Sequence, residues 1–358
     1  MKIGILTSGG DCQGLNAAIR GVAKALYNEF GSNVTIYGIR DGYRGLIEED
    51  YHPMSPRDFS DILTLGGTIL GTSRQPFKNM QVSEDNEDTK LEKMLTTIKR
   101  AEFDCLVILG GNGTHKTANL LSEHGVNVVT LPKTIDNDLW GTQVTFGFQS
   151  AMDIVCQVID CIHSTAFSHS RVFIVEVMGH KAGWLTLHAG IASGADVIII
   201  PEIPYSAKAV AAAIEKRQRN GKRFSIIAVA EGAISKEEAK MSKKEFKAAR
   251  AQMPYPSISY RLAEELKALT GNDEIRVTIP GHFQRGGAPC AADRLLCTRL
   301  GAAAARLIRD EKYGYMVAVQ NDKIVPVPLK DVAGKLKGVP VDSELVQTAR
   351  DLGLSLGD

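Results

Sequence analysis

Two carboxylates stand two residues apart in TLPKTIDNDLW, residues 130–140, directly after an apolar run rich in β-branched residues. A sugar hydroxyl is a poor nucleophile until its proton is accepted, and Asp136 could accept that proton. Asp138 could hold Mg²⁺, which neutralises charge on a transferred phosphoryl group. In an extended chain both carboxylates would share one side, while Asn137 would point elsewhere and brace the loop. The pattern predicts phosphoryl transfer, although an Asx-rich turn without chemistry remains an alternative.

Two glycine turns each follow an apolar run and offer backbone N–H groups to an anion. Gly9 and Gly10 follow residues 2–7, and GGNGTHKT, residues 110–117, follows the run at 104–109. A helix-like segment comes after each turn, and the first N–H groups of a helix favour a phosphate. Neither turn matches G-x-G-x-x-G or the P-loop, so the two commonest nucleotide fingerprints are absent. A tight structural turn is the alternative for each.

Arginines and histidines stand near the ends of several expected strands and in one loop rich in glycine and serine. Because arginine forks match phosphate geometry, several of them converging would bind a bis-phosphorylated product. For each arginine alone a surface ion pair is the alternative, and the spacing of the histidines does not suggest a metal site. These candidates are Arg74, Arg171, His180, Arg276, His282 and Arg285.

Short apolar runs alternate with helix-like segments and would position these groups. Runs that are apolar on successive positions are typical of strands buried on both faces, as in parallel sheets. The pattern predicts a doubly wound α/β fold with ligands at the carboxyl ends of the strands. Strands are expected at 2–7, 34–40, 104–109, 126–131, 171–177, 196–200, 224–230 and 275–280, with a hairpin at 315–329. Helices are expected at 14–29, 87–100, 115–124, 181–193, 206–219 and 257–270, and a solvated helix in the charged run 235–252.

Composition narrows the function class further. The chain has 358 residues, which favours two domains, and a net charge of +1, which indicates no general nucleic-acid affinity. No stretch reaches 18 apolar residues, and the N-terminal apolar run is too short for a signal peptide. The six cysteines form no CxxC pair and are expected to be reduced thiols. We therefore expect a cytoplasmic enzyme without membrane contacts.

Taken together, these stretches resemble the phosphofructokinase family. They run in family order and cover most of residues 3–300. The matching pieces include GILTSGGDCQGLNAAIRG (4–21), DGYRGL (41–46), GGTILGTSR (66–74), GGNGT (110–114), PKTIDND (132–138), RVFIVEVMGHKAGW (171–184) and RVTIPGHFQRGGAP (276–289). The resemblance implies two doubly wound α/β domains with the active site in the cleft between them. It also implies phosphate transfer to O1 of fructose 6-phosphate, the committed step of glycolysis.

The resemblance assigns each domain a substrate. Residues 1–147 plus about 284–334 would form the donor (ATP)-binding domain, and residues 148–283 plus about 335–358 the sugar-phosphate-binding domain. Because Arg171 and Arg276 reach into a neighbouring subunit's site in the family, the resemblance implies a homodimer or homotetramer that shares active sites.

The family's roles carry over residue by residue. Asp136 matches the catalytic base, assisted by Thr134, Asp138 and Arg74, and Mg²⁺ would be held by Asn112 and Asp138. The donor-side matches are Gly10, Tyr43, Arg74, Gly111, Asn112, Gly113, Thr114 and Lys133. The sugar-phosphate matches are Thr134, Asp136, Arg171, Met178, Gly179, His180, Glu231, Arg276, His282 and Arg285. Two residues depart from the family pattern: ATP-dependent relatives usually carry arginine at position 180, and most members carry an acidic residue at position 112.

Two positions disagree about the phosphate donor. Pyrophosphate-dependent relatives commonly carry Asp where Gly113 stands, and that carboxylate would repel the α-phosphate of ATP by about 4 kcal/mol at 4 Å. They also carry Lys where Lys133 stands, whereas bacterial allosteric ATP users have Gly. We expect ATP, because Gly113 removes an obstacle, and keep pyrophosphate as the alternative. A non-catalytic regulatory subunit and a relative acting on another sugar phosphate, such as sedoheptulose 7-phosphate, also remain open, while a Rossmann dehydrogenase fails on the missing fingerprint.

Overall fold

The chain forms two compact α/β units in a computed structural model that describes residues 1–83 and 88–358. The first unit comprises Met1–Ser150 and Arg285–Lys337, and the second comprises Ala151–Gln284 and Gly338–Asp358. Each unit has its own sheet and its own apolar core, so each is described by itself. These bounds lie close to the ones expected from the sequence, whereas the substrate that each unit binds stays a prediction.

The first unit is built on a sheet that, among the described residues, has seven strands in the order β11-β10-β5-β4-β1-β2-β3. The pairs β2–β3 and β10–β11 are antiparallel and the other neighbouring pairs are parallel. The strands are β1 (Lys2–Thr7), β2 (Thr35–Ile39), β3 (Tyr51–Met54), β4 (Cys105–Gly110), β5 (Val128–Pro132), β10 (Tyr315–Gln320) and β11 (Lys323–Pro328). Strands β1, β4 and β5 are almost wholly buried, as their unbroken apolar runs predict.

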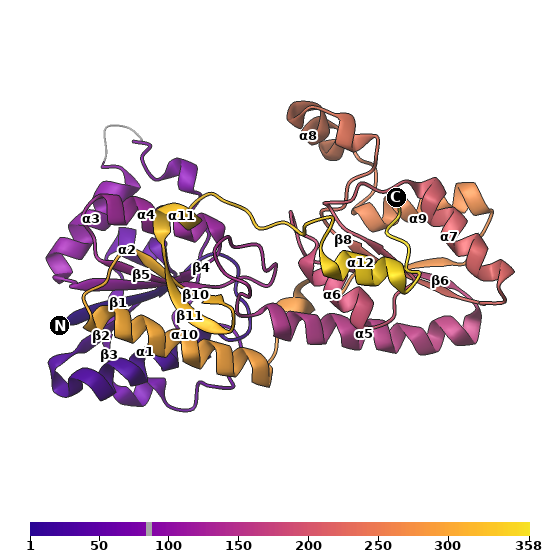
Figure 1. Ribbon diagram of the computed structural model, residues 1–358. Helices are drawn as coiled ribbons and strands as arrows, with labels where there is room; N and C mark the ends of the chain where they lie inside the picture. The colour runs from indigo at the N-terminus through magenta and orange to yellow at the C-terminus, as the bar shows by residue number, and fades with distance from the viewer. Residues whose placement is uncertain (84–87) are drawn as a thin grey trace. The chain divides into compact units, whose positions relative to one another are not determined.

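Helices cover both faces of this sheet (Figure 1). One apolar core lies between the sheet and helices α2, α3, α4 and α11, and includes Leu106, Met94 and Leu121. On the other face α1 and α10 lie side by side, and Gly21 and Gly301 let their backbones meet, since a Cβ on Gly301 would stand 2.6 Å from the backbone nitrogen of Val22. The helices are α1 (Leu15–Phe30), α2 (Tyr43–Glu48), α3 (Lys90–Ala101), α4 (Asn112–Glu123), α10 (Ala291–Arg309) and α11 (Leu329–Val332).

The second unit has a four-stranded sheet in the order β7-β8-β6-β9, parallel throughout. A core that includes Ile174, Ile227, Ile214 and Leu262 joins it to α7 and α9. Its strands are β6 (Val172–Val177), β7 (Val197–Ile199), β8 (Ser225–Ala230) and β9 (Ile275–Thr278). Its helices are α5 (Phe148–His169, which begins in the last residues of the first unit), α6 (Trp184–Ala192), α7 (Ala207–Arg219), α8 (Lys243–Ala251), α9 (Ile258–Thr270) and α12 (Glu344–Asp351).

The predicted doubly wound, largely parallel architecture is confirmed, and apart from the helix expected over 235–252 every expected strand and helix has a counterpart within a few residues. The charged run 235–252 is not one solvated helix: α8 covers only Lys243–Ala251 and has no buried residue, whereas Ser235 and Glu238 before it are buried. The hairpin turns at Asn321 and Asp322, both left-handed with φ of 49° and 59°. The sequence patterns did not predict β3 or the helices α2, α5, α10, α11 and α12. Residue 87, where one expected helix was placed to begin, lies outside the described residues, and α3 begins at Lys90.

The remaining expectations concern thiols and membranes. All six cysteines lie in the described ranges as free thiols, and Cys12, Cys105 and Cys297 are buried. Burial raises the pKa of the Cys12 thiol to about 12, so this thiol is inert. Within residues 1–83 and 88–358 no helix combines the length and apolar character that a membrane span requires.

Candidate active site

Three neighbouring strands of the first unit end at the same edge of the sheet. Strands β5, β4 and β1 lie next to one another, and the chain leaves β1 toward β2 on one side and returns through β4 on the other. This is the topological switch point at which open α/β sheets bind ligands. The loops that follow these strands begin at Ser8, Gly111 and Lys133.

A cavity of about 390 Å³ opens among these loops. It gathers both glycine turns, both carboxylates and three cationic side chains that the sequence singled out. Its lining residues are Ser8, Gly9, Gly10, Arg74, Gln75, Pro76, Phe77, Gly111, Asn112, Gly113, Thr114, Lys133, Thr134, Asp136, Asp138 and Arg285. Sequence reasoning did not name Ser8, Gln75, Pro76 or Phe77, although the last three directly follow Arg74 and could have been included with it.

Asp136 and Asp138 both line this cavity, but the backbone between them is not extended as expected. Asn137 between them is left-handed, with φ of 51°, so the segment bends there and is not extended. The expectation that Asn137 braces the loop is confirmed. Its Oδ1 accepts from the backbone N–H of Thr145 at 3.1 Å, and its Nδ2 donates to the carbonyl of Gln143 at 3.3 Å. Asn tolerates this backbone better than most residues, which explains its place between Asp136 and Asp138.

Asp138 and the nearby Lys133 have shifted pKa values. Burial, with the neighbouring charge of Asp136, raises the pKa of Asp138 to about 6. Burial lowers the pKa of the Lys133 ammonium, which is 4% exposed and donates to the carbonyl of Gly10. Perturbed acidities in a cavity are typical of functional sites. A second lysine, Lys337, has a pKa lowered by burial to about 8, so it is still protonated at neutral pH.

Asn112 presents an oxygen that the protein itself does not use. Its Nδ2 donates to the carbonyl of Lys335 at 2.6 Å, whereas its Oδ1 is buried and has no hydrogen-bond partner among the described residues. An orphaned amide oxygen on a residue that lines the same cavity as Asp138 fits Mg²⁺, which usually binds one or two protein oxygens together with substrate phosphates. In the described ranges no cluster of three or more His, Cys, Asp or Glu could hold a metal by itself.

Gly113, Gly10 and Tyr43, all expected on the donor side, lie in different surroundings. A Cβ on Gly113 would find open space, so its missing side chain leaves room at the start of α4. Gly10 is crowded, because a Cβ there would stand 3.0 Å from Nη1 of Arg285 and 3.5 Å from Arg74. Tyr43 does not line the cavity. It is 1% exposed, and its hydroxyl donates to the carbonyl of Thr114 at 2.8 Å, so it supports the second glycine turn from within the core.

In the second unit the predicted sugar-binding turn follows β6. The backbone N–H of Met178 donates to Oε1 of Gln284 at 2.9 Å, and that of Gly179 to Oε1 of Glu231 at 3.4 Å. His180 is exposed. The next turn cannot carry a side chain at position 232, because a Cβ on Gly232 would stand 2.0 Å from the carbonyl oxygen of His180. Met178, Gly179, His180 and Glu231 therefore lie together at the carboxyl ends of β6 and β8.

The other sugar-phosphate candidates lie on different segments, and two of them are arginines held in ion pairs. Arg171 and Arg276 both pair with Glu274, and the second pair measures 3.1 Å. His282 lies exposed in the 3₁₀ turn Gly281–Arg285. Arg285 belongs to the first unit, where its Nη1 donates to the carbonyl of Asp11 at 2.9 Å within the cavity.

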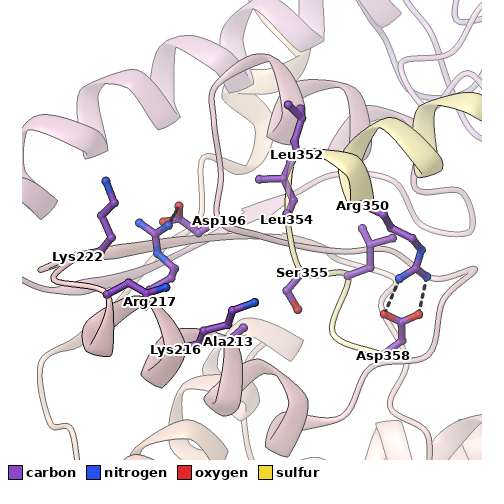
Figure 2. A pocket seen from close by; sticks show the side chains of 13 residues that line it. Asp196, Ala213, Lys216, Arg217, Lys222, Arg350, Leu352, Leu354, Ser355 and Asp358 are labelled. Atoms are coloured by element: carbon purple, nitrogen blue, oxygen red, sulfur yellow. Dashed lines mark hydrogen bonds and ion pairs between the residues drawn. The ribbon is translucent and has the colours of Figure 1, made fainter.

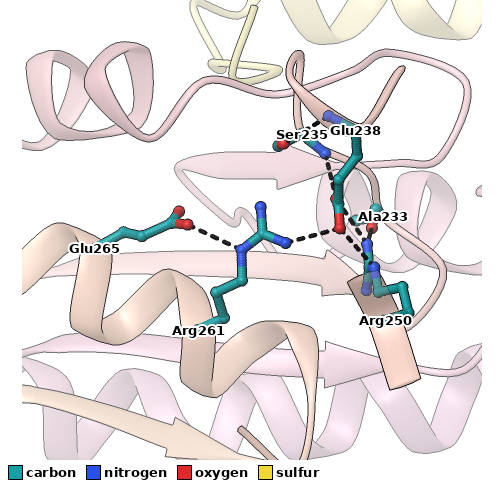
Figure 3. Close-up of polar contacts among 6 residues, drawn as sticks. All are labelled: Ala233, Ser235, Glu238, Arg250, Arg261 and Glu265. Carbon is teal, nitrogen blue, oxygen red and sulfur yellow. Dashed lines mark hydrogen bonds and ion pairs between the residues drawn. The ribbon is translucent and has the colours of Figure 1, made fainter. Parts of the chain in front are cut away.

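A charged network holds the loop that follows Glu231 (Figure 3). Glu238 is 5% exposed and accepts from Nε and Nη2 of Arg250 at 2.7 and 2.9 Å and from Nη1 of Arg261 at 2.7 Å. It also accepts from the backbone N–H of Ser235 at 2.9 Å. Burial raises the pKa of this carboxyl, but the N–H of Ser235 and the two guanidinium groups outweigh burial and leave the pKa below its usual value.

A second cavity, of about 560 Å³, lies in the second unit between the end of α7 and the C-terminal residues (Figure 2). None of the predicted site residues lines it. Its arginines are paired: Arg217 with Asp196 at 2.7 Å and Arg350 with Asp358 at 2.5 Å. The cavity in the first unit, although smaller, is therefore the one that gathers the predicted chemistry.

Comparison with known proteins agrees with this geometry. The phosphofructokinase family model matches residues 2–308. The chain is 55% identical to the ATP-dependent 6-phosphofructokinase of Spirochaeta thermophila, over 99% of this chain and 97% of that protein. It is 47% identical to the ATP-dependent 6-phosphofructokinase of Propionibacterium freudenreichii, over the full length of both.

A solved structure extends the likeness to the fold. Pichia pastoris phosphofructokinase in the T-state is 33% identical with a TM-score of 0.79, and the likeness spans 92% of this chain but 35% of the Pichia chain. A family match over most of the chain, with full-length relatives this similar, leaves one assignment: the chain belongs to the phosphofructokinase family.

Proposed function

We propose that this protein transfers the γ-phosphoryl group of ATP to O1 of fructose 6-phosphate and releases fructose 1,6-bisphosphate and ADP. The observation that carries the proposal is the cavity in which both glycine turns, Asp136 and Asp138 meet at the sheet's switch point. The relatives that match nearly the whole chain are named as ATP-dependent enzymes of this activity. The reaction is the committed step of glycolysis.

In this mechanism Asp136 accepts the proton of the attacking hydroxyl as the new O–P bond forms. The carboxylate must be ionised to do so. Thr134, whose Oγ1 accepts from the backbone N–H of Asp136 at 3.1 Å, fixes the start of the loop. Arg74, Lys133 and Arg285 surround the cavity with positive charge, and such charge stabilises the equatorial oxygens of a phosphoryl group in transfer.

Mg²⁺ would be held by Oδ1 of Asn112 and the carboxylate of Asp138. The metal would neutralise charge on the phosphates of the donor. A neutral amide in place of a second carboxylate gives a weaker site, so binding depends more on the oxygens of the donor. The raised pKa of Asp138, about 6, falls when a cation binds to it, so metal binding should release protons in mildly acidic buffer.

The second unit would bind the sugar phosphate. Glu231 and the turn Met178–His180 offer a carboxylate, backbone groups and an imidazole at the ends of β6 and β8. Arg171, Arg276 and His282 would bind the phosphate group. We infer that the two arginines serve the site of a neighbouring subunit, so the active form is a homodimer or homotetramer, and that the enzyme works in the cytoplasm.

Two features favour ATP over pyrophosphate. The first is the open space at Gly113, where a carboxylate would repel the α-phosphate. The second is Phe77, which is 39% exposed at the cavity and offers an aromatic face to a nucleotide base. Pyrophosphate has no base and would not use that face.

Initial rates test the proposal, with fructose 6-phosphate and Mg²⁺ present and ATP or pyrophosphate supplied separately. ATP should support turnover with one ADP formed per fructose 1,6-bisphosphate, and pyrophosphate should not replace it. Turnover with pyrophosphate alone would mean that Lys133 and Asn112 outweigh Gly113. Turnover with neither donor would point to a non-catalytic regulatory subunit, or to another sugar phosphate such as sedoheptulose 7-phosphate, which the same assay can include.

A further inference from the structure

The loop that carries Asp136 and Asp138 needs support from outside itself. A left-handed Asn137 between them costs free energy, and a strained backbone persists where its surroundings over-determine it. The polypeptide from Asp136 to Gln143 has little regular structure, so its own backbone pairing is sparse. Besides the bonds that Asn137 makes to Thr145 and Gln143, the loop has partners elsewhere in the unit.

Lys337 supplies such partners from 200 residues away in sequence. Its Nζ donates to Oδ1 of Asn137 at 3.0 Å, to the carbonyl of Thr142 at 2.8 Å and to the carbonyl of Gln143 at 3.0 Å. A lysine ammonium has three N–H donors, and each has an acceptor here. The three acceptors lie on both arms of the loop, so one side chain ties the arms together.

The backbone of the same segment adds a second attachment. The N–H of Lys337 donates to the carbonyl of Asp138 at 2.9 Å, and Leu336 forms an antiparallel bridge with Leu139. One residue earlier, the carbonyl of Lys335 accepts from Asn112. Residues 335–337 therefore contact the candidate base loop and the candidate metal ligand at once.

We propose that Lys337 is a positioning residue for the phosphoryl transfer: its ammonium, held by Asn137 and the carbonyls of Thr142 and Gln143, fixes the bend that aims both carboxylates into the cavity. The inference rests on the proposed function. A lysine with this role touches no substrate, so its loss should slow the chemical step and leave substrate affinity almost unchanged. A misplacement of about 1 Å from outside the reacting groups can cost roughly 10²-fold in rate.

The test compares Lys337→Met with Lys337→Arg and with the matched control Lys330→Met, which removes an exposed lysine from α11 in the same unit. For Lys337→Met we expect kcat to fall by at least ~30-fold while KM for ATP and for fructose 6-phosphate stays within about 3-fold. Lys337→Arg should recover part of kcat, because it keeps the charge but cannot reproduce the three acceptor directions. Lys330→Met should match the wild type.

A folded Lys337→Met enzyme with wild-type kcat would overturn the proposal, and so would a loss confined to KM. If the methionine variant does not fold, Lys337→Gln is judged by the same two criteria. Hydrogen exchange at the Thr145 amide gives a readout without activity, since that N–H donates to Asn137. The protection of this amide against exchange should fall about 10-fold in Lys337→Met, whether or not the wild type is active. An inactive wild type would refute the proposed function but not this structural role. Unchanged protection in Lys337→Met would refute the role of Lys337 in holding the loop.

Discussion

One loop in each unit is held by a charged side chain, the half-buried Lys337 in the first and the buried Glu238 in the second, and the two charges have opposite signs. In the first unit Lys337 donates to three neutral oxygens around the bend at Asn137. In the second unit Glu238 accepts from two guanidinium groups and a backbone N–H in the loop after Glu231. The first arrangement relies on neutral acceptors, with the charge of Asp138 acting on the ammonium as well, whereas the second is an ion-pair network.

This difference indicates that the charges near Lys337 serve the reaction, whereas the charges around Glu238 stabilise the fold. Burial and the charge of Asp136 raise the pKa of Asp138 to about 6 despite the nearby Lys337, so the ionised carboxylate is unfavourable there and a bound cation would relieve it. At Glu238 the opposite holds, since its partners lower the pKa despite burial. Disturbing the first region should therefore change activity more than stability, and disturbing the second should change stability first.

The largest effect is expected for Gly113→Asp. Its Cβ would meet open space at the N-terminus of α4, where an acidic residue favours a helix, so the thermal midpoint should be unchanged or slightly higher. The new carboxylate should repel ATP and lower kcat/KM for ATP by at least ~10²-fold. Steady-state kinetics would measure the loss of kcat/KM, and thermal unfolding would measure the change in the thermal midpoint.

Gly113→Ser is the control, because it adds a side chain without charge. It should keep most of the ATP activity. A similar loss in both variants would show that bulk, not charge, closes the cavity. An aspartate variant that still uses ATP normally would remove the physical basis for the donor assignment.

A smaller effect is expected for Glu238→Gln. The amide keeps the shape but loses the charge shared with Arg250 and Arg261, whose side chains are 19% and 18% exposed and can reach water in part. We expect the free energy of unfolding of the second unit to fall by about 2 kcal/mol at pH 7. Urea unfolding measures it, with the exposed neighbour variant Glu237→Gln as the control.

The difference in the free energy of unfolding between the wild type and Glu238→Gln should depend on pH. The folded pKa of Glu238 lies below its unfolded value of 4.5, so its stabilisation is fully present above pH 4.5 and is lost as pH falls through the folded pKa. The difference in the free energy of unfolding between the wild type and Glu238→Gln should therefore become smaller below pH 4.5. If this difference stayed constant down to pH 3, the charge of Glu238 would not stabilise the unit, and only its packing would remain as a role.

Much of this organisation could be read from local sequence patterns. The buried strands, the glycine turns and the Asp136–Asp138 pair are local features, and the rule that ligands gather at the carboxyl ends of parallel strands brings them together. The bend at Asn137 was not predicted, because alternation alone suggests an extended chain and the left-handed residue depends on partners elsewhere.

Long-range partners could not be predicted. Lys337 is one lysine among many in the sequence, and nothing near it indicates a contact 200 residues earlier. Tyr43 matched a donor-side position, yet its burial depends on how α2 packs against Thr114, which local sequence does not encode. The pairing of Arg171 and Arg276 with Glu274 follows from neighbouring strands β6 and β9, whose order only the fold reveals.

The most direct test of the central claim is the single-turnover rate of Asp136→Asn at saturating ATP and fructose 6-phosphate. Asparagine has the same shape but cannot take the proton of the hydroxyl as a carboxylate does. We predict a rate at least ~10²-fold below wild type, with the affinity for fructose 6-phosphate retained. A rate near that of the wild type would contradict the assignment of Asp136 as the base, and with it the placement of the reaction in this cavity.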